Sequence, residues 1–352
     1  MVIGGALIAG ATIAVLGVCV LLVLLVVAVR ARRHRRQRRE EMLLSPLRPH
    51  LIEVAAGEDD EGVAVRQLTG ATDASRTVLD RNIVELLTKI RGVPAEQLVE
   101  VLEAHGAVEA AARDLTSRSA VRRARAAQLL GLARAGGAVP LLVNALEDEA
   151  VEVRNSAAYA LGLIGDAAAA GPVLSAIGHP ERGLPAATAA EALQSMGVGI
   201  SEVLREALDD DHPRTRMVAA HLSGERSFTR CLPDLRRLLE EDGDLTVRET
   251  CAHAIGRLGR GDDVEVLARH TGAGEPLALR RACVAALGEL GQPAAVPALA
   301  ALLDDPDPRL AELAAAGLLG LGADGREALV GHADDPAVQS AQLVASLQRA
   351  SA

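Results

Sequence analysis

The chain has 352 residues, of which 49% are hydrophobic and 1% aromatic, and its net charge is −10 at neutral pH. Since Tyr159 and Phe228 are the only aromatic residues, Ala, Leu, Val and Ile must fill the core, which suits stacked helices and suits a large β-sandwich poorly. After residue 39 the acidic residues outnumber the basic ones by 47 to 30, and this negative charge disfavours binding to nucleic acid phosphates. The almost exclusive use of arginine for basic charge is typical of a GC-rich bacterial genome.

The first element is an uncharged apolar segment at residues 2–29 that contains no proline. At about 1.5 Å of rise per residue, roughly 20 such residues cross the hydrocarbon layer, so residues 1–29 predict a transmembrane helix and not a shorter signal peptide. Seven arginines follow it: Arg30, Arg32, Arg33, Arg35, Arg36, Arg38 and Arg39. Basic residues that flank a span stay on the cytoplasmic side. We therefore expect a single-pass protein of the cell membrane, with its N-terminus outside and the remaining chain in the cytoplasm.

Two further interpretations of this region stay open. Ala6, Gly10 and Ala14 form a small-xxx-small stripe through which two spans can self-associate, although alanine- and glycine-rich helices often show such a stripe by chance. Residues 30–49 are expected to form a basic juxtamembrane linker, whose arginines can also contact anionic headgroups.

Residues 50–119 are expected to be helical but irregular, either as a cap or as divergent repeats. Within them, the sequence GEDDEG at residues 57–62 predicts a charged, solvated loop.

Internal periodicity dominates residues 120–352. Prolines at positions 140, 172, 233 and 297 each open an apolar run such as VPLLVNALED, and proline favours the first turn of a helix, so each run predicts a first helix. A second helix follows, and its anchor residues recur every 28 to 32 positions: Val121, Val153, Pro185, Thr215, Val247, Leu279, Leu310 and Val338. A glycine predicts the end of most second helices: Gly165, Gly197, Gly259, Gly291 and Gly322.

The Val-Pro start, the acidic turn, the Val-Arg pair and the LGxLG-like ending resemble the short HEAT repeat that is named for phycobilisome lyases. The resemblance implies a right-handed superhelix of antiparallel helix pairs that serves protein–protein recognition. The fold is thus expected to be all-α, with an N-terminal transmembrane helix followed by an α-α superhelix, a HEAT-like solenoid. Small residues four positions after the anchors should let neighbouring second helices approach closely: Ala157, Ala189, Ala219, Cys251 and Cys283.

Charged residues recur in register with the repeat. Arginines follow an acidic residue by six positions in three copies, as Asp148 and Arg154, Asp210 and Arg216, and Asp242 and Arg248. Arg280 holds the same place in the next copy, and Ala311 replaces the arginine in the one after it. These charges would either bind a ligand or form a structural ladder of turn carboxylates that pair with the next helix or repeat. The recurrence favours the structural ladder, because a specific site seldom repeats every 32 residues.

Cys251, His253 and Cys283 are residue types that bind zinc. Residues two apart on a helix do not face each other, however, and both cysteines occupy positions that hold alanine in other copies. Buried core positions are therefore favoured over a metal site. The odd number of cysteines after the apolar segment suits a reducing compartment.

No motif indicates an enzyme. Deoxyhypusine hydroxylase, a HEAT-like enzyme, would need repeated His-Glu pairs, and none of the nine histidines precedes glutamate. A tetrapyrrole pocket like that of a phycobilin lyase would draw on aromatic residues, which are nearly absent. We expect a membrane-anchored scaffold or regulatory protein without cofactor. By resemblance its protein partner would be a membrane enzyme such as an envelope glycosyltransferase. A lyase-like or metal-dependent HEAT-repeat enzyme is the alternative.

Overall fold

The computed structural model describes residues 25–27, 30–32, 34–35 and 38–351. The segment that the sequence predicts as a membrane span therefore lies outside the described residues, apart from positions 25–27, and so do Arg33 and Arg36. Arg30, Arg32, Arg35, Arg38 and Arg39 are exposed. Within the described ranges, no helix has the length and apolar character that a membrane crossing requires.

The chain divides into two units, residues 1–111 and 112–352. The division falls inside helix α6 (Ala107–Asp114), a few residues before the boundary at 119/120 that the sequence predicts. From residue 48 onward, the helices of the first unit before α6 are α2 (Arg48–Ala56), α3 (Val63–Thr69), α4 (Asp73–Leu87) and α5 (Val93–Ala104). Helix α5 packs against the other three. Leu68, Leu79 and Leu98 are fully buried between them.

The acidic sequence at residues 57–62 is not a purely solvated loop, contrary to the sequence-based expectation. Asp59 is 4% exposed, and its carboxylate accepts hydrogen bonds from the backbone amides of Ala64 and Val65 at 3.1 and 2.9 Å. Those amides belong to the first turn of α3, where no intrahelical acceptor is available. Burial alone would raise the pKa of Asp59, but these hydrogen bonds outweigh burial and lower it. One acidic residue of this segment therefore caps a helix.

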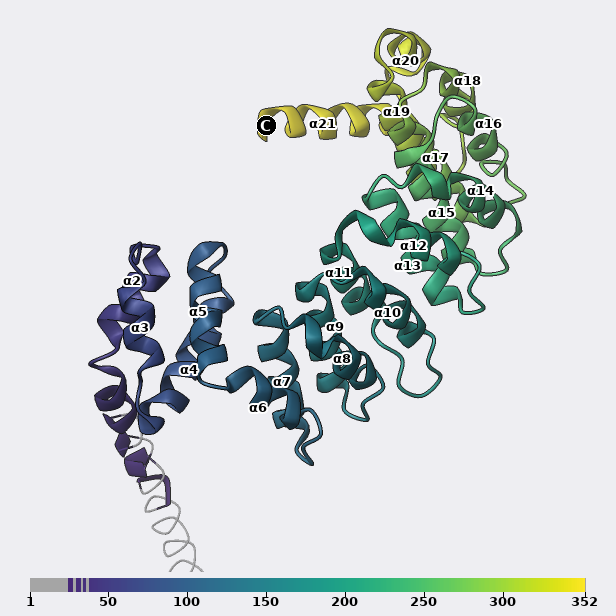
Figure 1. Ribbon diagram of the computed structural model, residues 1–352. Helices are drawn as coiled ribbons and strands as arrows, with labels where there is room; N and C mark the ends of the chain where they lie inside the picture. Colours follow the sequence, from purple (N-terminus) through teal and green to yellow (C-terminus); the bar gives the residue numbers. More distant parts are fainter. Residues whose placement is uncertain (1–24, 28–29, 33, 36–37, 352) are drawn as a thin grey trace, which may run out of the picture. The chain divides into compact units, whose positions relative to one another are not determined.

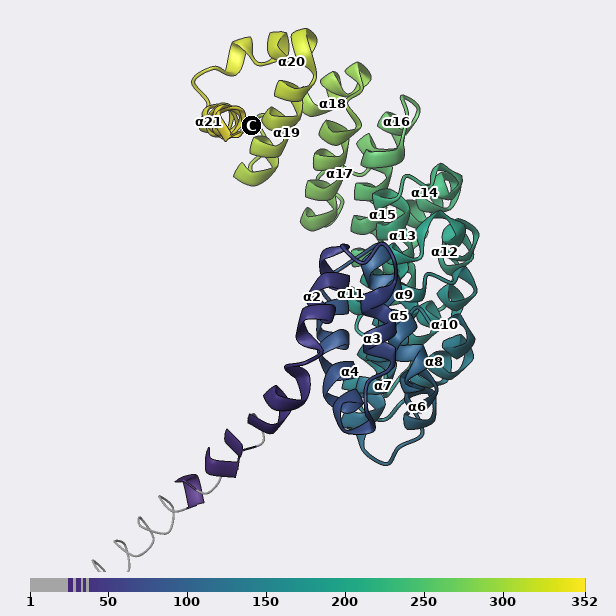
Figure 2. The ribbon, with the colours of Figure 1, turned by 60° about the vertical axis from the view of Figure 1, so that its left-hand side comes forward.

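The second unit is a stack of helix pairs, as the sequence predicts. Its first helices are short: α8 (Val139–Ala145), α10 (Ala170–Ile177), α12 (Ser201–Ala207), α14 (Leu232–Glu241), α16 (Asp263–Ala268), α18 (Val296–Ala300) and α20 (Gly322–Ala328). Its second helices are mostly longer: α7 (Ala120–Leu132), α9 (Val151–Ile164), α11 (Ala186–Ser195), α13 (Pro213–Glu225), α15 (Leu245–Leu258), α17 (Leu277–Leu290), α19 (Pro308–Gly320) and α21 (Pro336–Ser351). Each second helix packs against the next, and Figures 1 and 2 show the two kinds of helix in separate layers.

Short 3-10 helices lead into most first helices: η1 (Gly136–Ala138), η2 (Ala167–Ala169), η3 (Gly197–Ile200), η4 (Thr229–Cys231) and η5 (Pro293–Ala295). A sixth, η6 (Val330–His332), follows α20. Pro140, Pro233 and Pro297 stand in the first turn of α8, α14 and α18, where the missing N–H of proline removes no helix hydrogen bond.

The anchors of the second helices form the core, with two exceptions. Val153, Val247, Leu279, Leu310 and Val338 are fully buried. Val121 is instead 60% exposed, because the matching position in α7 is Arg122, one residue later, and Pro185 caps α11 without being buried. Each fully buried leucine or valine side chain contributes about 1.5–3 kcal/mol relative to an exposed one.

Close approach between second helices occurs at a glycine that lies nine positions after the anchor. A Cβ on Gly131, Gly162 or Gly256 would lie 2.5 to 2.9 Å from the Cα of an alanine in the next second helix. The small residues at the fourth position, such as Ala157 and Cys251, are fully buried but are not these contact points. Neighbouring second helices therefore do approach closely, as the sequence predicts, but at the ninth position after the anchor and not at the fourth.

The residue twelve positions after the anchor ends or follows the second helix. Gly165 and Gly291 have φ of 77° and 68° and cap α9 and α17, because left-handed backbone costs glycine little. Gly259 ends α15 with extended backbone at φ −69°. Arg134 and Ser227 adopt positive φ, 49° and 57°, at this position without being glycine.

Candidate functional site

The turns before the second helices present fixed carboxylates. The carboxylate of Asp148 accepts a hydrogen bond from the backbone amide two residues later at 2.8 Å, and those of Asp242 and Asp305 do so at 2.8 and 3.0 Å. Each of these contacts leaves one carboxylate edge free to accept further donors. The repeat thus places an oriented negative charge at the same point of successive copies.

Arginines from the preceding repeat fill these places. Arg123 contacts both carboxylate oxygens of Asp148 at 2.6 and 2.8 Å, and Arg216 contacts both of Asp242 at 2.7 and 2.8 Å. Arg280 reaches Asp305 at 2.5 Å. We call this series of pairs the arginine ladder. Such two-point contacts between arginine and carboxylate are strong and directional.

One step of the arginine ladder uses a different carboxylate. The turn before α17 has no aspartate in the usual place, and Arg248 contacts Glu275 at 3.2 Å instead. Glu275 is also 2.8 Å from Nδ1 of His270. The hydrogen bond from His270 contributes most to lowering the pKa of Glu275, and Arg248 lowers it further.

The partners differ from those that a six-residue spacing suggests. Arg154 donates to the backbone carbonyl of Asp148 at 2.8 Å, and Arg216 donates to that of Asp210 at the same distance. Arg248 donates to the carbonyl of Leu239. Within a repeat, the arginine side chain therefore binds backbone carbonyls of the turn. The carboxylate of the turn pairs with the arginine of the preceding repeat.

Arg123 was missed from the sequence, although it lies 31 positions before Arg154 and so continues the arginine series. The signal was hidden because neighbouring positions 122 and 125 are also arginine. Burial disfavours charge on Asp148, yet the hydrogen bond from Arg123 and the turn amide outweigh it and lower the pKa of Asp148. The same hydrogen bond raises the pKa of Arg123.

The three described cysteines are buried and free. Burial raises the pKa of Cys251 and Cys283 to about 12, so both thiols stay protonated at neutral pH. His253, two positions after Cys251, is exposed on the other side of α15. In the described ranges, no group of three or more His, Cys, Asp and Glu side chains is arranged to hold a metal ion.

The second helices also carry an exposed row, which we call the sixth-position row because it lies six residues after the anchors. Its members are Tyr159 on α9, Glu191 on α11, His221 on α13 and His253 on α15. The side chain of Tyr159 is 39% exposed, and aromatic residues are enriched at protein interfaces. Ion pairs of Arg257 with Glu225 and Glu289 connect α15 to both of its neighbours one turn further on.

Comparison with known proteins identifies the repeat. Residues 107–194 and 201–277 match the family of HEAT repeats, and residues 279–305 match the PBS lyase HEAT-like repeat. No curated protein sequence matches the chain.

Several solved structures are similar. A mutant of Kap121p has 10% identity and a TM-score of 0.54, over 78% of this chain and 35% of that chain. The complex of CpcE and CpcF of phycocyanin lyase from a Nostoc species has 24% identity and a TM-score of 0.34, over 66% of this chain and 94% of that chain. Human deoxyhypusine hydroxylase has 21% identity and a TM-score of 0.29, over 79% of this chain and 98% of that chain. The likeness to Kap121p concerns the fold alone, and the other two overlap too loosely to bear on function.

Proposed function

The chain is a HEAT-like repeat protein, and from this premise we propose that it is a membrane-anchored scaffold whose solenoid binds a protein partner in the cytoplasm. The observation that carries the proposal is the unbroken stack of second helices from α7 to α21. A stack of repeats offers an extended surface for a partner, while its inner contacts maintain the solenoid. The arginine ladder belongs to those inner contacts, so its charges hold repeats together.

The sixth-position row supplies a surface of the kind a partner contacts. Four consecutive second helices each present an exposed polar or aromatic side chain there. Tyrosine is enriched at protein interfaces, because its ring contributes apolar area and its hydroxyl a hydrogen bond. We therefore place the partner on the layer of second helices, with Tyr159 as a principal contact.

Membrane attachment rests on the sequence. The apolar segment at residues 2–29 is long enough to span, and the seven arginines at residues 30–39 favour a cytoplasmic solenoid. Attachment would keep the solenoid beside proteins of the same membrane. A membrane enzyme such as an envelope glycosyltransferase of a bacterium would be a partner of this kind.

The proposal is tested by capturing the tagged full-length chain with its partner from membranes of the source cell. We expect one protein at a fixed ratio, and about tenfold weaker binding of it by the Tyr159→Ala variant. Leu141→Ala is the matched control, because Leu141 is 40% exposed on α8, in the layer of first helices. Equal loss in both variants, or no protein at a fixed ratio, would contradict the proposal.

The same purified sample separates the scaffold from a lyase-like or metal-dependent enzyme. A scaffold predicts no visible absorption band and no metal at a fixed ratio to protein. A bound chromophore, or a metal ion at one or two per chain, would favour the enzyme instead.

A further inference from the structure

The arginine ladder lacks one arginine near the end of the solenoid. At the position of Arg216, Arg248 and Arg280, helix α19 carries Ala311. The following turn nevertheless keeps its aspartate, Asp335, whose Oδ1 accepts a hydrogen bond from the amide of Ala337 at 2.8 Å. This is the contact that orients the carboxylates of Asp148, Asp242 and Asp305 toward arginine.

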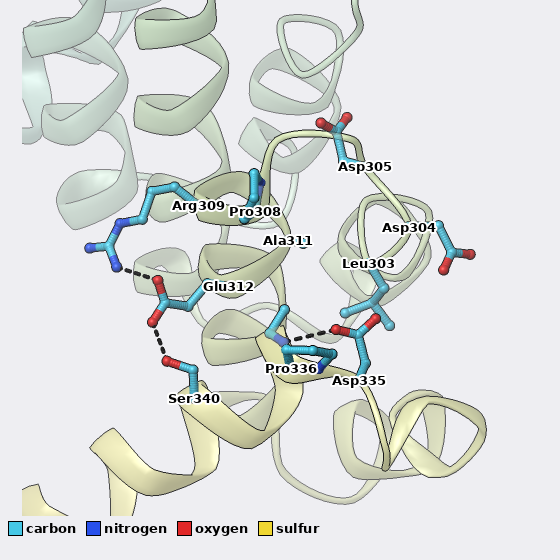
Figure 3. A pocket seen from close by; sticks show the side chains of 11 residues that line it. Leu303, Asp304, Asp305, Pro308, Arg309, Ala311, Glu312, Asp335, Pro336 and Ser340 are labelled. Atoms are coloured by element: carbon cyan, nitrogen blue, oxygen red, sulfur yellow. Dashed lines mark hydrogen bonds and ion pairs between the residues drawn. The ribbon is translucent and has the colours of Figure 1, made fainter.

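A cleft of about 620 Å³ lies where the missing arginine would extend (Figure 3). Four carboxylates and one guanidinium line it: those of Asp304, Asp305, Glu312, Asp335 and Arg309. It opens to solvent, since the side chain of Asp304 is 86% exposed. The cleft therefore has room for a cationic side chain that enters from outside.

Most of these charges already have partners. Asp305 pairs with Arg280 at 2.5 Å. Glu312 contacts Arg309 at 2.6 Å and the hydroxyl of Ser340 at 2.5 Å. In contrast, Asp335 forms no ion pair within the described ranges, and its carboxylate lines the cleft with one hydrogen bond, from the amide of Ala337 to Oδ1. Three equivalent aspartates of the same chain, Asp148, Asp242 and Asp305, each bind a guanidinium, which identifies the group that fits here.

An apolar stripe continues from the cleft along α21. Ser340 lines the cleft, and residues three, four and seven positions later share its face of the helix: Leu343, Val344 and Leu347. Leu343 and Leu347 are both 62% exposed and Val344 is 47% exposed. A contiguous exposed apolar stripe of this kind is typical of a surface that a protein partner covers.

We propose that this end of the solenoid binds a segment of the protein partner whose arginine enters the cleft onto Asp335 and whose apolar side chains cover Leu343 and Leu347. The inference rests on the proposed scaffold function and names the chemistry of its partner. Arginine suits the site better than lysine, because its planar fork contacts both oxygens of a carboxylate.

Another repeat of the same chain also lacks the arginine of the ladder and offers an internal control. Helix α11 carries Ala186 at the arginine position, and Asp210 occupies the following turn. The cleft of about 340 Å³ beside Asp210 is smaller and already contains the side chains of Arg216 and Arg237. Asp210 accepts the same hydrogen bond from the amide two residues later, at 2.8 Å, but Val218 and Leu222 on the following helix are buried, so no exposed apolar stripe adjoins it.

The first test titrates N-acetyl-L-arginine methylamide into the purified full-length chain and follows the broadening of its NMR signals. We expect saturable binding that Asp335→Asn weakens about tenfold and that Ala311→Arg abolishes, since the new arginine completes the ladder. Asp210→Asn and Ala186→Arg should leave binding unchanged, and the lysine analogue should bind more weakly. Equal binding by Ala311→Arg and by the unaltered chain would overturn the proposal, provided that circular dichroism shows both folded.

The second test measures partner capture by the same variants. Loss of the partner in Ala311→Arg, with Ala186→Arg unaffected, supports the inference. Full capture by Ala311→Arg would refute the inference while leaving the scaffold function intact, whereas failure of capture by the unaltered chain would refute the function itself. If Ala311→Arg instead abolishes dimers of the chain in sedimentation experiments, the occupant is a second copy and the assignment to a partner is wrong.

Discussion

Asp242 shows how a single side chain joins two repeats. Its carboxylate is 2% exposed, accepts a backbone hydrogen bond that fixes its own turn, and contacts two nitrogens of Arg216 from the preceding repeat. Arg216 donates a further hydrogen bond to the carbonyl of Asp210. With a further hydrogen bond to the carbonyl of Asp211, one arginine thus connects the turn before its own helix with the turn of the next repeat.

At this scale we expect Arg216→Ala to lower the free energy of unfolding by about 2–4 kcal/mol, because it leaves the buried carboxylate of Asp242 without its cation. Arg205→Ala is the matched control. Its pair with Glu202 is exposed at 38% and 57% of the two side chains, so we expect a loss below about 1 kcal/mol. Urea denaturation of the two variants measures both values. Equal losses would show that the arginine ladder adds nothing beyond an ordinary surface pair.

The same pair predicts how stability depends on pH. Burial alone would raise the pKa of Asp242, but the hydrogen bonds from Arg216 and from the amide of Asp244, together with the nearby arginine charges, outweigh burial and keep the pKa below the ordinary value of 3.8. A carboxyl with a lower pKa in the folded chain stabilises the fold above its unfolded pKa, and this stabilisation is lost as pH falls through the folded pKa. Thermal melting should therefore shift to lower temperature between about pH 5 and 3.

Asp242→Asn isolates this contribution, because asparagine does not titrate. We expect the variant to be less stable at neutral pH and to lose less stability than the unaltered chain as the pH falls. Parallel pH profiles for the two proteins would mean that Asp242 keeps its ordinary pKa in the folded state.

At the scale of the helix, contact between neighbours depends on glycine. A Cβ on Gly256 of α15 would lie 2.8 Å from the Cα of Ala286 in α17, closer than side-chain carbons approach backbone. We expect Gly256→Ala to destabilise the chain by about 2 kcal/mol or more, although alanine is the better helix former. Gly171→Ala in α10 is the control, since no atom lies within 4 Å of its added Cβ. That variant should gain up to about 1 kcal/mol in a denaturation experiment, and destabilisation by both would indicate a general intolerance of alanine.

The helices themselves could be predicted from the sequence, because each repeat carries the same local signals. Prolines mark the first helices, and buried anchors such as Val153 and Val247 recur with the period of the fold. The anchor of α7 was predicted one residue too early, at Val121, because neighbouring arginines conceal the position that matches Val153. The role of Asp59 could not be predicted either, because an acidic segment favours a solvated loop unless the helix amides that it binds are known.

The candidate site was less predictable for a physical reason. A spacing of six residues relates charges within one repeat, whereas the contacts join residues of successive repeats that lie 25 to 27 positions apart, as in Arg123 with Asp148. Which repeat an arginine reaches depends on the rotation between successive helix pairs, and no local pattern states that rotation. The replacement of an arginine by Ala311 was visible in the sequence, but the cleft beside it was not.

At the scale of the whole molecule, the membrane proposal makes a prediction of its own. Residues 2–29 should hold the full-length chain in the membrane fraction through an alkaline carbonate wash, because a spanning helix buries about 20 apolar residues. Protease added to intact cells should leave the solenoid uncut, and protease added to lysed cells should remove it. Release of the chain by carbonate would contradict the anchor, while cleavage in intact cells would contradict its direction.

Partner binding by the solenoid is the central claim, and the mass of the native assembly tests it most directly. The full-length chain of 36.5 kDa is purified gently from its own membranes, and light scattering measures the mass of the protein complex. We predict an assembly that contains a second, different protein at a fixed ratio in repeated preparations. A chain that is recovered alone, or only with copies of itself, would contradict the claim that this solenoid is a scaffold for another protein.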